Sequence, residues 1–581
     1  MKNPKRYLSA ILASLILLSA TACTLVSNES ADETNEKNDV TASSTVSETE
    51  STAEPETVPV TEPGTELVTE PGTESVTVPV TEPVTEPTDE PSDEPSDEPF
   101  DEPSDEPESE TETETESETE TEPVTEPETE VTDDLPRLDF GGAEITVISR
   151  DIVGLTHGEI VFDEALATPL NEAVFERNKA VEEKLNVKIV HIPNDTFDPY
   201  VLPNLVATDV KGGSTEYDIM AASAYTTIQH TLSGNFVNLA DNEYINLSKP
   251  YWLQALNETI SYKNLQFMAT GSFMPSVYRL AFATMFNKDL FEEANQPLLY
   301  EYVENGSWTV DQQASLTSLF YRDNGDGMPD SQDVFGFVTG TSINVDPYWS
   351  AFRVDVMPRN QEGAWETAGT LTDSLVATTD KLLNLYYGET SSTYAVETGT
   401  DDSEQAEIRN MFASGHAAMA TLRLVELEND DFQDFNYGIV PMPKFDEAQD
   451  GYTSHLHDQF TIVAVPYTIA NERLDMVSAV LESMASAGHA LIRPAYCETV
   501  LRAEFDPEAK DVQMLDTIAD GIHIDFGILH NDFNFHAALR QMMYDRRNTT
   551  ASMLKARLKA ASYKLRTIVA NLDKMSEINT Q

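Results

Sequence analysis

The chain has 581 residues, of which 102 are acidic and 35 are lysine or arginine, so its formal net charge at pH 7 is -67. A surface of that sign repels phosphate backbones and anionic lipid headgroups, which excludes nucleic acids and acidic bilayer surfaces as partners. The length exceeds what one compact core usually organises, so two lobes or domains are expected.

The N-terminus has the pattern of a secreted, lipid-modified chain. A basic start precedes an uncharged apolar run from Leu8 to Ala20, which is shorter than the roughly 20 residues that span a bilayer. The run is followed by "TAC" ending at Cys23, and small residues before a cysteine resemble the bacterial lipobox, although Ala20 stands where leucine is usual. The prediction is a lipoprotein signal peptide over residues 1–23 with Cys23 as the lipidated residue. An ordinary secretory signal is the alternative.

Residues 24–134 form a long acidic segment of low complexity. They repeat Thr, Glu, Pro, Asp and Ser, hold 38 acidic residues against one lysine, and contain a single aromatic residue, Phe100. Such a segment cannot bury enough apolar surface to offset the entropy of ordering, and its like charges repel. The prediction is a disordered stalk with a reach of up to about 300 Å at about 3 Å per residue. A tail without a spacing role is the alternative.

The remaining residues, 135–581, have the pattern of an α/β domain. An alternating stretch after Gly-Gly, "LDFGGAEITVISRD", predicts a strand, and "NEAVFERNKAVEEKL" predicts a helix that leads into a strand at Val187–Ile192. The buried stretch "EYDIMAASA" predicts another strand before a helix around Tyr225–Leu232. This rhythm predicts a mainly parallel sheet covered by helices. The chain ends on a stretch that predicts one amphipathic helix packed back on the body.

The motifs of common enzyme classes are absent from the sequence. It contains no GxSxG, no GxxxxGK, no HExxH and no GxGxxG after a strand. Five histidines could supply metal ligands, but nothing in the sequence brings them together: His455, His457, His523, His530 and His536. The prediction is a protein that is not an enzyme and uses no cofactor. Cys497 is the only other cysteine, so no disulfide is expected once Cys23 is acylated.

Several stretches occur in an order typical of one family. "FASGHAAMAT", beginning at Phe412, and "YGIVPMPK" some fifteen residues later resemble the F-x-x-G-x-x-A-M and P-x-P segments of family 1 extracellular solute-binding proteins. "AFATMFNKDLF" and "TIVAVP" resemble that family's crossing and return strands, and "NGSWTVDQQASL" resembles its Trp-Thr helix start, with Thr309 as the N-cap. The first strand and helix are similar to large clostridial lipoproteins of this class. The resemblance covers about residues 138–581.

The resemblance implies a two-lobed, periplasmic-binding-protein-like (type II) α/β fold with a central cleft. Lobe 1 is expected at about residues 135–283 and 459–505, and lobe 2 at about residues 284–458 and 506–581. It also implies a monomeric receptor, lipid-anchored on the extracellular face of the cell membrane. Such a receptor binds a small solute, here expected to be a sugar or oligosaccharide, by cleft closure and delivers it to an ABC permease.

Two neighbouring aromatic residues are the first candidates for the cleft. Tyr348 and Trp349 lie in "VDPYWSAF", which resembles the family's acid-Pro-Tyr stretch, where the tyrosine commonly meets the sugar. A proline disfavours helical backbone at the residue before it, so a loop that projects these rings is predicted. Core packing is the alternative for each ring.

Three further candidates follow from position. Tyr225 follows the carboxyl end of a predicted strand, where open α/β sheets bind ligands. Trp252 lies in the polar stretch "KPYWLQ", and Arg423 follows the "AAMAT" strand at a place where many sugar binders of the family carry a tryptophan. The arginine argues against a simple maltose-like solute.

The stretch "YRDNGDGMPDSQDVFG" at residues 321–336 has the spacing of a calcium loop. Its candidate ligands are Asn324, Asp326, Asp330 and Asp333. The first ligand position is occupied by Arg322, so an Asx and glycine turn that needs no ion is the alternative. In either case the stretch resembles an insertion that the family often carries after the Trp-Thr helix.

Two other classes of function stay open at this point. A surface glycan hydrolase would need two carboxylates at a defined separation. An adhesive module displayed on the stalk would bind a macromolecule and show no cleft closure.

Overall fold

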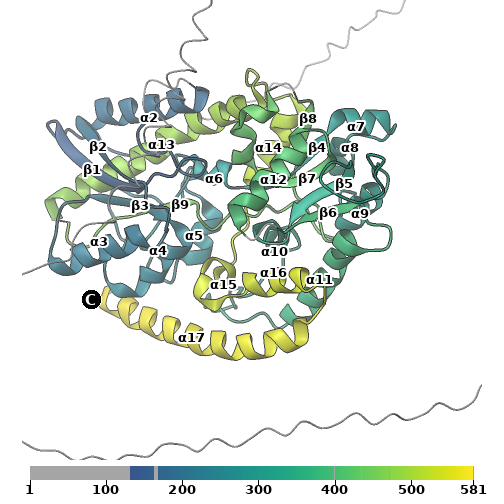
Figure 1. Cartoon of the computed structure of the whole chain (residues 1–581). Coiled ribbons are helices and arrows are strands. Elements are labelled where there is room, and N and C mark those ends of the chain that lie inside the picture. Colours follow the sequence, from purple (N-terminus) through teal and green to yellow (C-terminus); the bar gives the residue numbers. More distant parts are fainter. Residues whose placement is uncertain (1–130, 163–167, 398–399, 434, 470, 580–581) are drawn as a thin grey trace, which may run out of the picture. The chain divides into compact units, whose positions relative to one another are not determined.

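The computed structural model describes residues 131–162, 168–397, 400–433, 435–469 and 471–579. The predicted signal peptide with Cys23, and all but the last four residues of the predicted stalk, lie outside these residues. Two β-sheets organise the described part of the chain (Figure 1).

The first sheet has the strand order β2-β1-β3-β9. β1 pairs in parallel with β2 and β3, whereas β9 pairs antiparallel with β3. The strands are β1 Ala143–Arg150, β2 Val187–Asn194, β3 Ile219–Ser223 and β9 Thr461–Ala464. The last strand of this sheet, β9, follows all strands of the second sheet in the sequence. We call the half that contains this sheet lobe 1.

The second sheet has the strand order β6-β5-β7-β4-β8, and its half of the molecule is lobe 2. β5 pairs in parallel with β6 and β7, whereas β4 pairs antiparallel with both β7 and β8. The strands are β4 Phe282–Asn287, β5 Phe335–Gly340, β6 Thr393–Val396, β7 Ala417–Arg423 and β8 Tyr437–Val440. In each sheet three parallel strands are followed by an antiparallel strand that arrives from the other lobe. This shared order is that of the two-lobed type II α/β fold, as predicted.

Helices cover both sheets, in agreement with the βαβ rhythm of the sequence. The helices of lobe 1 are α2 Pro169–Leu185, α3 Val201–Gly212, α4 Ala224–Thr227, η1 Ile228–Ser233, α5 Gln254–Ile260, α6 Ser276–Arg279 and α13 Asn471–Leu501. Those on the lobe 2 side are α7 Lys288–Glu293, α8 Leu299–Glu304, α9 Val310–Thr317, η2 Ile343–Val345, α10 Pro347–Ala351, α11 Leu371–Tyr387, α12 Asp401–Ala413, η3 Leu424–Glu428, η4 Asp430–Phe432, α14 Lys510–Asp520, α15 Phe526–Leu529, η5 Asn531–Phe533 and α16 His536–Tyr544. None of the helices in the described ranges is long and apolar enough to cross a membrane.

Helix ends follow local sequence signals. The side chain of Thr309 accepts a hydrogen bond from the backbone N–H of Gln312 at 3.2 Å, which confirms the predicted N-cap of α9. Thr168 caps α2 in the same way, with a proline at the first helical position, where its missing N–H costs nothing. Gly415 links α12 to β7 with a φ of 77°, a left-handed conformation that favours glycine.

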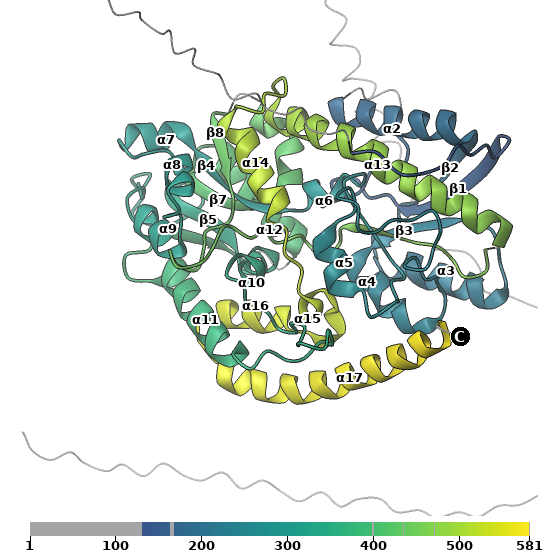
Figure 2. The same ribbon diagram turned by 180° about the vertical axis from the view of Figure 1, so that it is seen from behind.

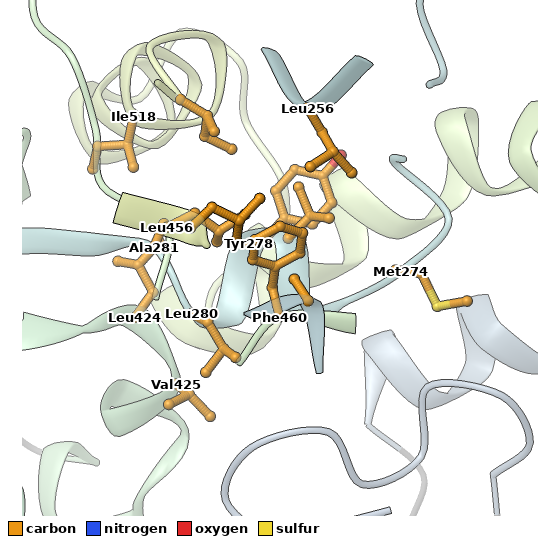
Figure 3. Packing of buried hydrophobic residues seen from close by; sticks show 14 of the residues in the cluster. Leu256, Met274, Tyr278, Leu280, Ala281, Leu424, Val425, Leu456, Phe460 and Ile518 are labelled. Atoms are coloured by element: carbon orange, nitrogen blue, oxygen red, sulfur yellow. The ribbon is translucent and has the colours of Figure 1, made fainter. Parts of the chain in front are cut away.

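Two antiparallel segments cross between the lobes. Leu280 to Phe282 lead into β4, and His455 to Phe460 return into β9. The backbone N–H of Phe282 donates to the carbonyl of His455 at 3.0 Å, and that of His457 donates to Leu280 at 2.9 Å. Buried apolar side chains pack around this crossing (Figure 3): Leu280, Ala281, Leu424, Leu456 and Phe460. A third connection, residues 502–509, leads from α13 to α14.

The chain ends in one long helix, α17 Thr550–Asn579, which confirms the predicted amphipathic helix. Leu554, Ala561 and Leu565 are buried, whereas Tyr563 on the outer face is exposed. The helix contacts α11 and α16 on the lobe 2 side and η1 of lobe 1. Both views show it running along one side of the two lobes (Figures 1 and 2).

Replacement of Thr309 by alanine removes the acceptor for the Gln312 N–H at the start of α9. We expect Thr309→Ala to lower the free energy of unfolding by about 1 kcal/mol. Urea denaturation monitored by circular dichroism measures this change. Thr309→Ser keeps the hydroxyl and serves as the control; equal stability of the two variants would show that the cap contributes nothing.

Candidate functional site

The carboxyl ends of strands from both sheets meet at the crossing segments. On the lobe 1 side, β1 ends at Arg150. On the lobe 2 side, β7 ends at Arg423, which pairs with Phe282 of the crossing strand β4. The backbone N–H of Tyr225, just after β3, donates to the carbonyl of Asp458 at 3.1 Å. Open α/β sheets bind ligands at such ends. We call this group the interlobe site, and its members are Arg150, Tyr225, Asp346, Arg423, His457, Asp458 and Arg540.

Arg150 and Tyr225 form the lobe 1 wall of the interlobe site. The guanidinium of Arg150 is buried and donates from Nη1 to the hydroxyl of Ser223 at 2.9 Å and from Nη2 to the carbonyl of Phe197 at 3.0 Å. The ring of Tyr225 packs edge to face on Tyr200, with ring centres 5.7 Å apart. Burial, reinforced by the nearby Asp458, raises the pKa of Tyr225, so its hydroxyl stays protonated at neutral pH.

Two arginines form the lobe 2 wall. Arg540 of α16 binds both carboxylate oxygens of Asp346 through one guanidinium edge, with Nε 2.9 Å from Oδ1 and Nη2 in contact with Oδ2. Although burial opposes it, this guanidinium holds the pKa of Asp346 below its ordinary value. Arg423 donates from Nη2 to Oε1 of Glu426 at 2.7 Å. The lobe 2 wall is therefore an ion-paired framework whose geometry is fixed before any ligand arrives.

His457 and Asp458 lie between the two walls, on the returning segment. Burial, with the positive charges of Arg423 and Arg150, holds the pKa of His457 well below its ordinary value, so the imidazole is neutral at pH 7. Burial raises the pKa of Asp458 to about 7, although 26% of the side chain remains exposed. No side-chain donor hydrogen-bonds to the Asp458 carboxylate within the described part of the chain.

Three buried nitrogen atoms of the site have no hydrogen-bond partner among the described residues. They are Nε of Arg150, Nε of Arg423 and Nδ1 of His457, on residues of which no more than 5% is exposed. Buried polar groups are nearly always paired, and an unpaired one costs about 1 to 3 kcal/mol. The arrangement therefore has the chemistry of a site for a polar occupant, either a hydrogen-bonding solute or ordered water.

A cavity of about 450 Å³ lies at the carboxyl end of β5 and shares Arg540 with the interlobe site. Its lining residues are Thr341, Ser342, Glu397, Glu404, Ala537, Arg540, Gln541 and Tyr544. Glu404 accepts the backbone N–H of Ser342 at 3.1 Å, and burial with the nearby Asp401 raises the pKa of Glu404 to about 7. The volume is in the range of small-molecule sites. Tyr544, 62% exposed, offers a ring beside the opening.

The structure brings Tyr225 and Arg423 together in the interlobe site and places the other sequence candidates differently. Trp349 is buried beside Asp346, and its indole N–H has no partner among the described residues. Tyr348 is fully buried and packs on Phe352, with ring centres 5.2 Å apart. Contact of these four side chains with a solute stays a prediction.

Trp252 lies apart from the interlobe site. Its indole N–H donates to Oε2 of Glu482 in α13 at 3.0 Å, and its ring packs edge to face on Phe273. The indole is therefore part of the packing of lobe 1, and any contact with a solute stays a prediction.

The loop predicted for Asp346 to Trp349 is wrong. Asp346 has helical backbone angles, φ -63° and ψ -35°, and Pro347 is the first residue of α10. Proline suits the first helical position because its fixed φ matches the helix and its missing N–H needs no partner. The short helix directs both rings inward.

Sequence reasoning missed five members of the site, and of these Asp346 entered only as the acid of the acid-Pro-Tyr stretch. Arg150 ends the first strand, so the rule that selected Tyr225 would also have found it. His457 was considered only as a metal ligand. Asp458 and Arg540 carry no local signal, because the topology alone brings them next to Arg150 and Asp346.

The acidic loop at residues 321–336 is held by Asx turns. The four calcium candidates each accept a backbone N–H: Asn324 from Asp326, Asp326 from Met328, Asp330 from Gln332, and Asp333 from Asn324. Calcium binding stays an untested prediction. Within the residues that the structure describes, no group of three His, Cys, Asp or Glu side chains is arranged to hold a metal ion.

The fold and site define a two-lobed α/β protein with a polar site between its lobes. No family model matches the chain, and no curated protein matches it. Solved structures with a similar fold include the GacH receptor of Streptomyces glaucescens, described unliganded and with acarbose. It is 14% identical, covers 73% of this chain and 98% of its own, and has a TM-score of 0.47.

Two further solved structures have a similar fold. An ABC substrate-binding protein from Listeria monocytogenes in complex with cycloalternan is 14% identical, covers 74% of this chain and 99% of its own, and has a TM-score of 0.43. A sugar transporter from Rhizobium etli in an open conformation is 14% identical, covers 72% of this chain and 98% of its own, and has a TM-score of 0.48.

The raised pKa of Asp458 makes the stability of the protein depend on pH. In the unfolded chain this carboxyl ionises near pH 4, whereas in the folded protein it holds its proton to about pH 7. The folded state therefore binds more protons between these values, and its stability falls as pH rises through that window. At about 1.4 kcal/mol per pKa unit, the fall is at most about 4 kcal/mol.

Asp458→Asn cannot ionise, so the stability of the variant relative to wild type should increase from pH 4.5 to pH 8. Urea denaturation across that range measures it. Glu447→Gln, at an exposed acid on the surface, is the control and should follow the wild-type profile. Parallel profiles for Asp458→Asn and wild type would contradict the assignment.

Proposed function

We propose that the chain is the extracellular solute-binding receptor of an ABC importer and that its solute is a carbohydrate held at the interlobe site. The observation that carries this proposal is the set of unpaired buried nitrogens on Arg150, Arg423 and His457, together with the Asp458 carboxylate that follows His457 on the returning segment. A sugar hydroxyl donates one hydrogen bond and accepts others, so it fits between a guanidinium N–H and a carboxylate. Hydrogen bonds to charged groups are the stronger ones.

The two crossing segments supply the hinge for this function. They join lobes whose walls contribute different halves of the site, Arg150 and Tyr225 on one side and Arg423 and Arg540 on the other. Rotation about such segments closes the lobes on a solute and excludes water. The succession of family motifs along residues 138–581 supports the same function.

The cellular context belongs to the same proposal. A lipid at Cys23 would anchor the chain on the extracellular face of the membrane, the acidic stalk over residues 24–134 would hold the lobes away from it, and a permease would receive the solute. The lobe boundaries that belong to this proposal lie near residues 283, 458 and 505.

A glycan hydrolase is the second candidate, favoured by Glu404. A general acid needs a pKa near the working pH, and the pKa of Glu404 is raised to about 7 in the same cavity that Glu397 lines. One measurement of the saccharide after incubation distinguishes the two functions. A receptor returns its saccharide unchanged, whereas a hydrolase releases products and loses turnover in Glu404→Gln.

A thermal-shift screen of the chain against mono- and oligosaccharides tests the receptor. Binding to the folded state alone raises stability by about 2.7 kcal/mol at a hundredfold excess over Kd, so a true solute should raise Tm visibly. For the best saccharide, Arg423→Gln should weaken binding by about 1.5 to 3 kcal/mol in calorimetry, the scale for a hydrogen bond to a charged group.

Arg566→Gln, on the outer face of α17, is the matched control and should bind as wild type does. The proposal fails if no saccharide raises Tm, or if Arg423→Gln binds the best saccharide with wild-type affinity.

The lipid anchor is tested on the mature protein. Intact-mass and peptide mass spectrometry of chain purified from membranes should find Cys23 as the first residue, carrying a lipid. Cys23→Ser removes the thiol that carries the lipid, so no lipid-modified peptide should be found in this variant. A mature chain with an unmodified Cys23 would contradict the anchor.

A further inference from the structure

The last helix binds both lobes through different halves. Its first half packs on the lobe 2 side, where Leu554 is buried and the hydroxyl of Thr550 lies 3.4 Å from that of Thr379 in α11. Its last half binds lobe 1. Asp573 accepts hydrogen bonds from the hydroxyl of Tyr262 at 2.9 Å and from Nζ of Lys263 at 2.6 Å.

A second contact joins the lobes beside α17. The loop between α10 and α11, on the lobe 2 side, reaches the C-terminal end of α5 in lobe 1. Arg359 donates to the carbonyls of Glu258 at 2.7 Å and Thr259 at 3.2 Å, and the indole of Trp365 donates to Thr259 at 3.0 Å. The last carbonyls of a helix lack partners within it and carry partial negative charge, which favours a guanidinium there.

Three aromatic rings stack in a row across the same boundary. Tyr262 of lobe 1 lies on Trp365 with ring centres 5.3 Å apart and an interplanar angle of 20°. Trp365 in turn lies on Phe526 of α15, at 4.1 Å and 18°. The stack therefore continues the hydrogen-bonded contact from one lobe into the other without using the interlobe site.

This boundary is less tightly packed than a protein core. Cavities of about 230 and 110 Å³ flank the stack, and both are lined by Trp365 and Phe526. His530, 7% exposed, lines the smaller one, and its Nδ1 has no partner among the described residues. The ion pair of Lys263 with Asp573 is itself half exposed. Voids and exposed ion pairs contribute little to cohesion, so these surfaces can separate.

We propose that α17 and the Arg359–Trp365 loop form a clasp between the lobes, and that this clasp must release before the interlobe site can open. Both contacts are made by the chain itself, so they hold the lobes together without a solute. A structure that is held only by its crossing segments would open freely. With the clasp, the open state is a minor population whose size depends on how strongly these contacts favour the closed one.

The proposal rests on the two-lobed geometry and goes beyond the proposed function, because it concerns lobe opening and holds for any solute. It is tested by electron-spin distance measurements on the full chain without added solute. Spin labels are attached at Asn204→Cys in α3 and Ser315→Cys in α9, both exposed sites, one in each lobe. The two native cysteines should not take up label, because Cys23→Ser removes the one in the N-terminal segment and Cys497 is buried.

The labelled chain with an intact clasp should give one narrow distance distribution. The clasp variant Arg359→Ala with Asp573→Ala should move at least a third of the molecules to longer distances. Lys559→Ala with Arg566→Ala, on exposed positions of the same helix, is the matched control and should keep the original distribution. An unchanged distribution in the clasp variant would overturn the proposal, as would an equally broad one in the parent chain.

A milder variant keeps the test decisive if the double variant unfolds. Trp365→Phe keeps an aromatic ring in the stack and loses only the N–H that binds Thr259, and it should give a smaller shift to longer distances. A well-folded Trp365→Phe with the parent distribution would argue against the clasp. Because no solute is present, failure of saccharide binding and failure of the clasp are separate results.

Discussion

The pairing of two short antiparallel segments is the constraint on which the rest of the structure depends. The backbone bonds between Phe282 and His455, and between His457 and Leu280, fix where the chain leaves lobe 1 and where it returns. Side chains alternate along such a pair, so a slip of one residue would turn His457 away from the strand ends. The same bonds therefore set both the relation of the two sheets and the contents of the interlobe site.

The interlobe site combines fixed charges with unpaired hydrogen-bonding groups. Arg540 and Asp346 neutralise each other, and Arg423 is held by Glu426, so the walls keep their geometry in a poorly solvated place. Against that framework, the unpaired nitrogens of Arg150, Arg423 and His457 carry a cost that packing elsewhere must offset. Natural sequences tolerate such a cost chiefly where a ligand or ordered water removes it.

Two of the connections between the lobes differ in physical character. The crossing segments are backbone connections surrounded by buried apolar side chains. The contacts of α17 and the Arg359–Trp365 loop are side-chain contacts flanked by cavities. A covalent hinge with a separable side-chain contact elsewhere gives a two-lobed protein a defined closed state in the absence of any ligand, while it leaves the opening motion available.

Local sequence signals determined the elements of this protein. Periodicity placed α2, β2 and the final helix, the Thr309 signal placed the start of α9, and strand ends pointed to Tyr225. These predictions succeed because side-chain spacing and capping act over a few residues. The same locality explains the failure at Pro347, since a proline is equally compatible with a loop and with the first position of a helix.

Only the tertiary structure decided which of those residues form a site. Arg540 binds Asp346, and Arg150 comes within electrostatic reach of Asp458, across long stretches of chain that the two sheets fold between them. Trp252 and Tyr348 have the composition of ligand-binding residues but are used to fill lobes, and burial of a large ring is favourable wherever space is left for it. No spacing along the chain encodes these choices, because they depend on the register of the crossing segments and on how the two sheets divide the available apolar surface.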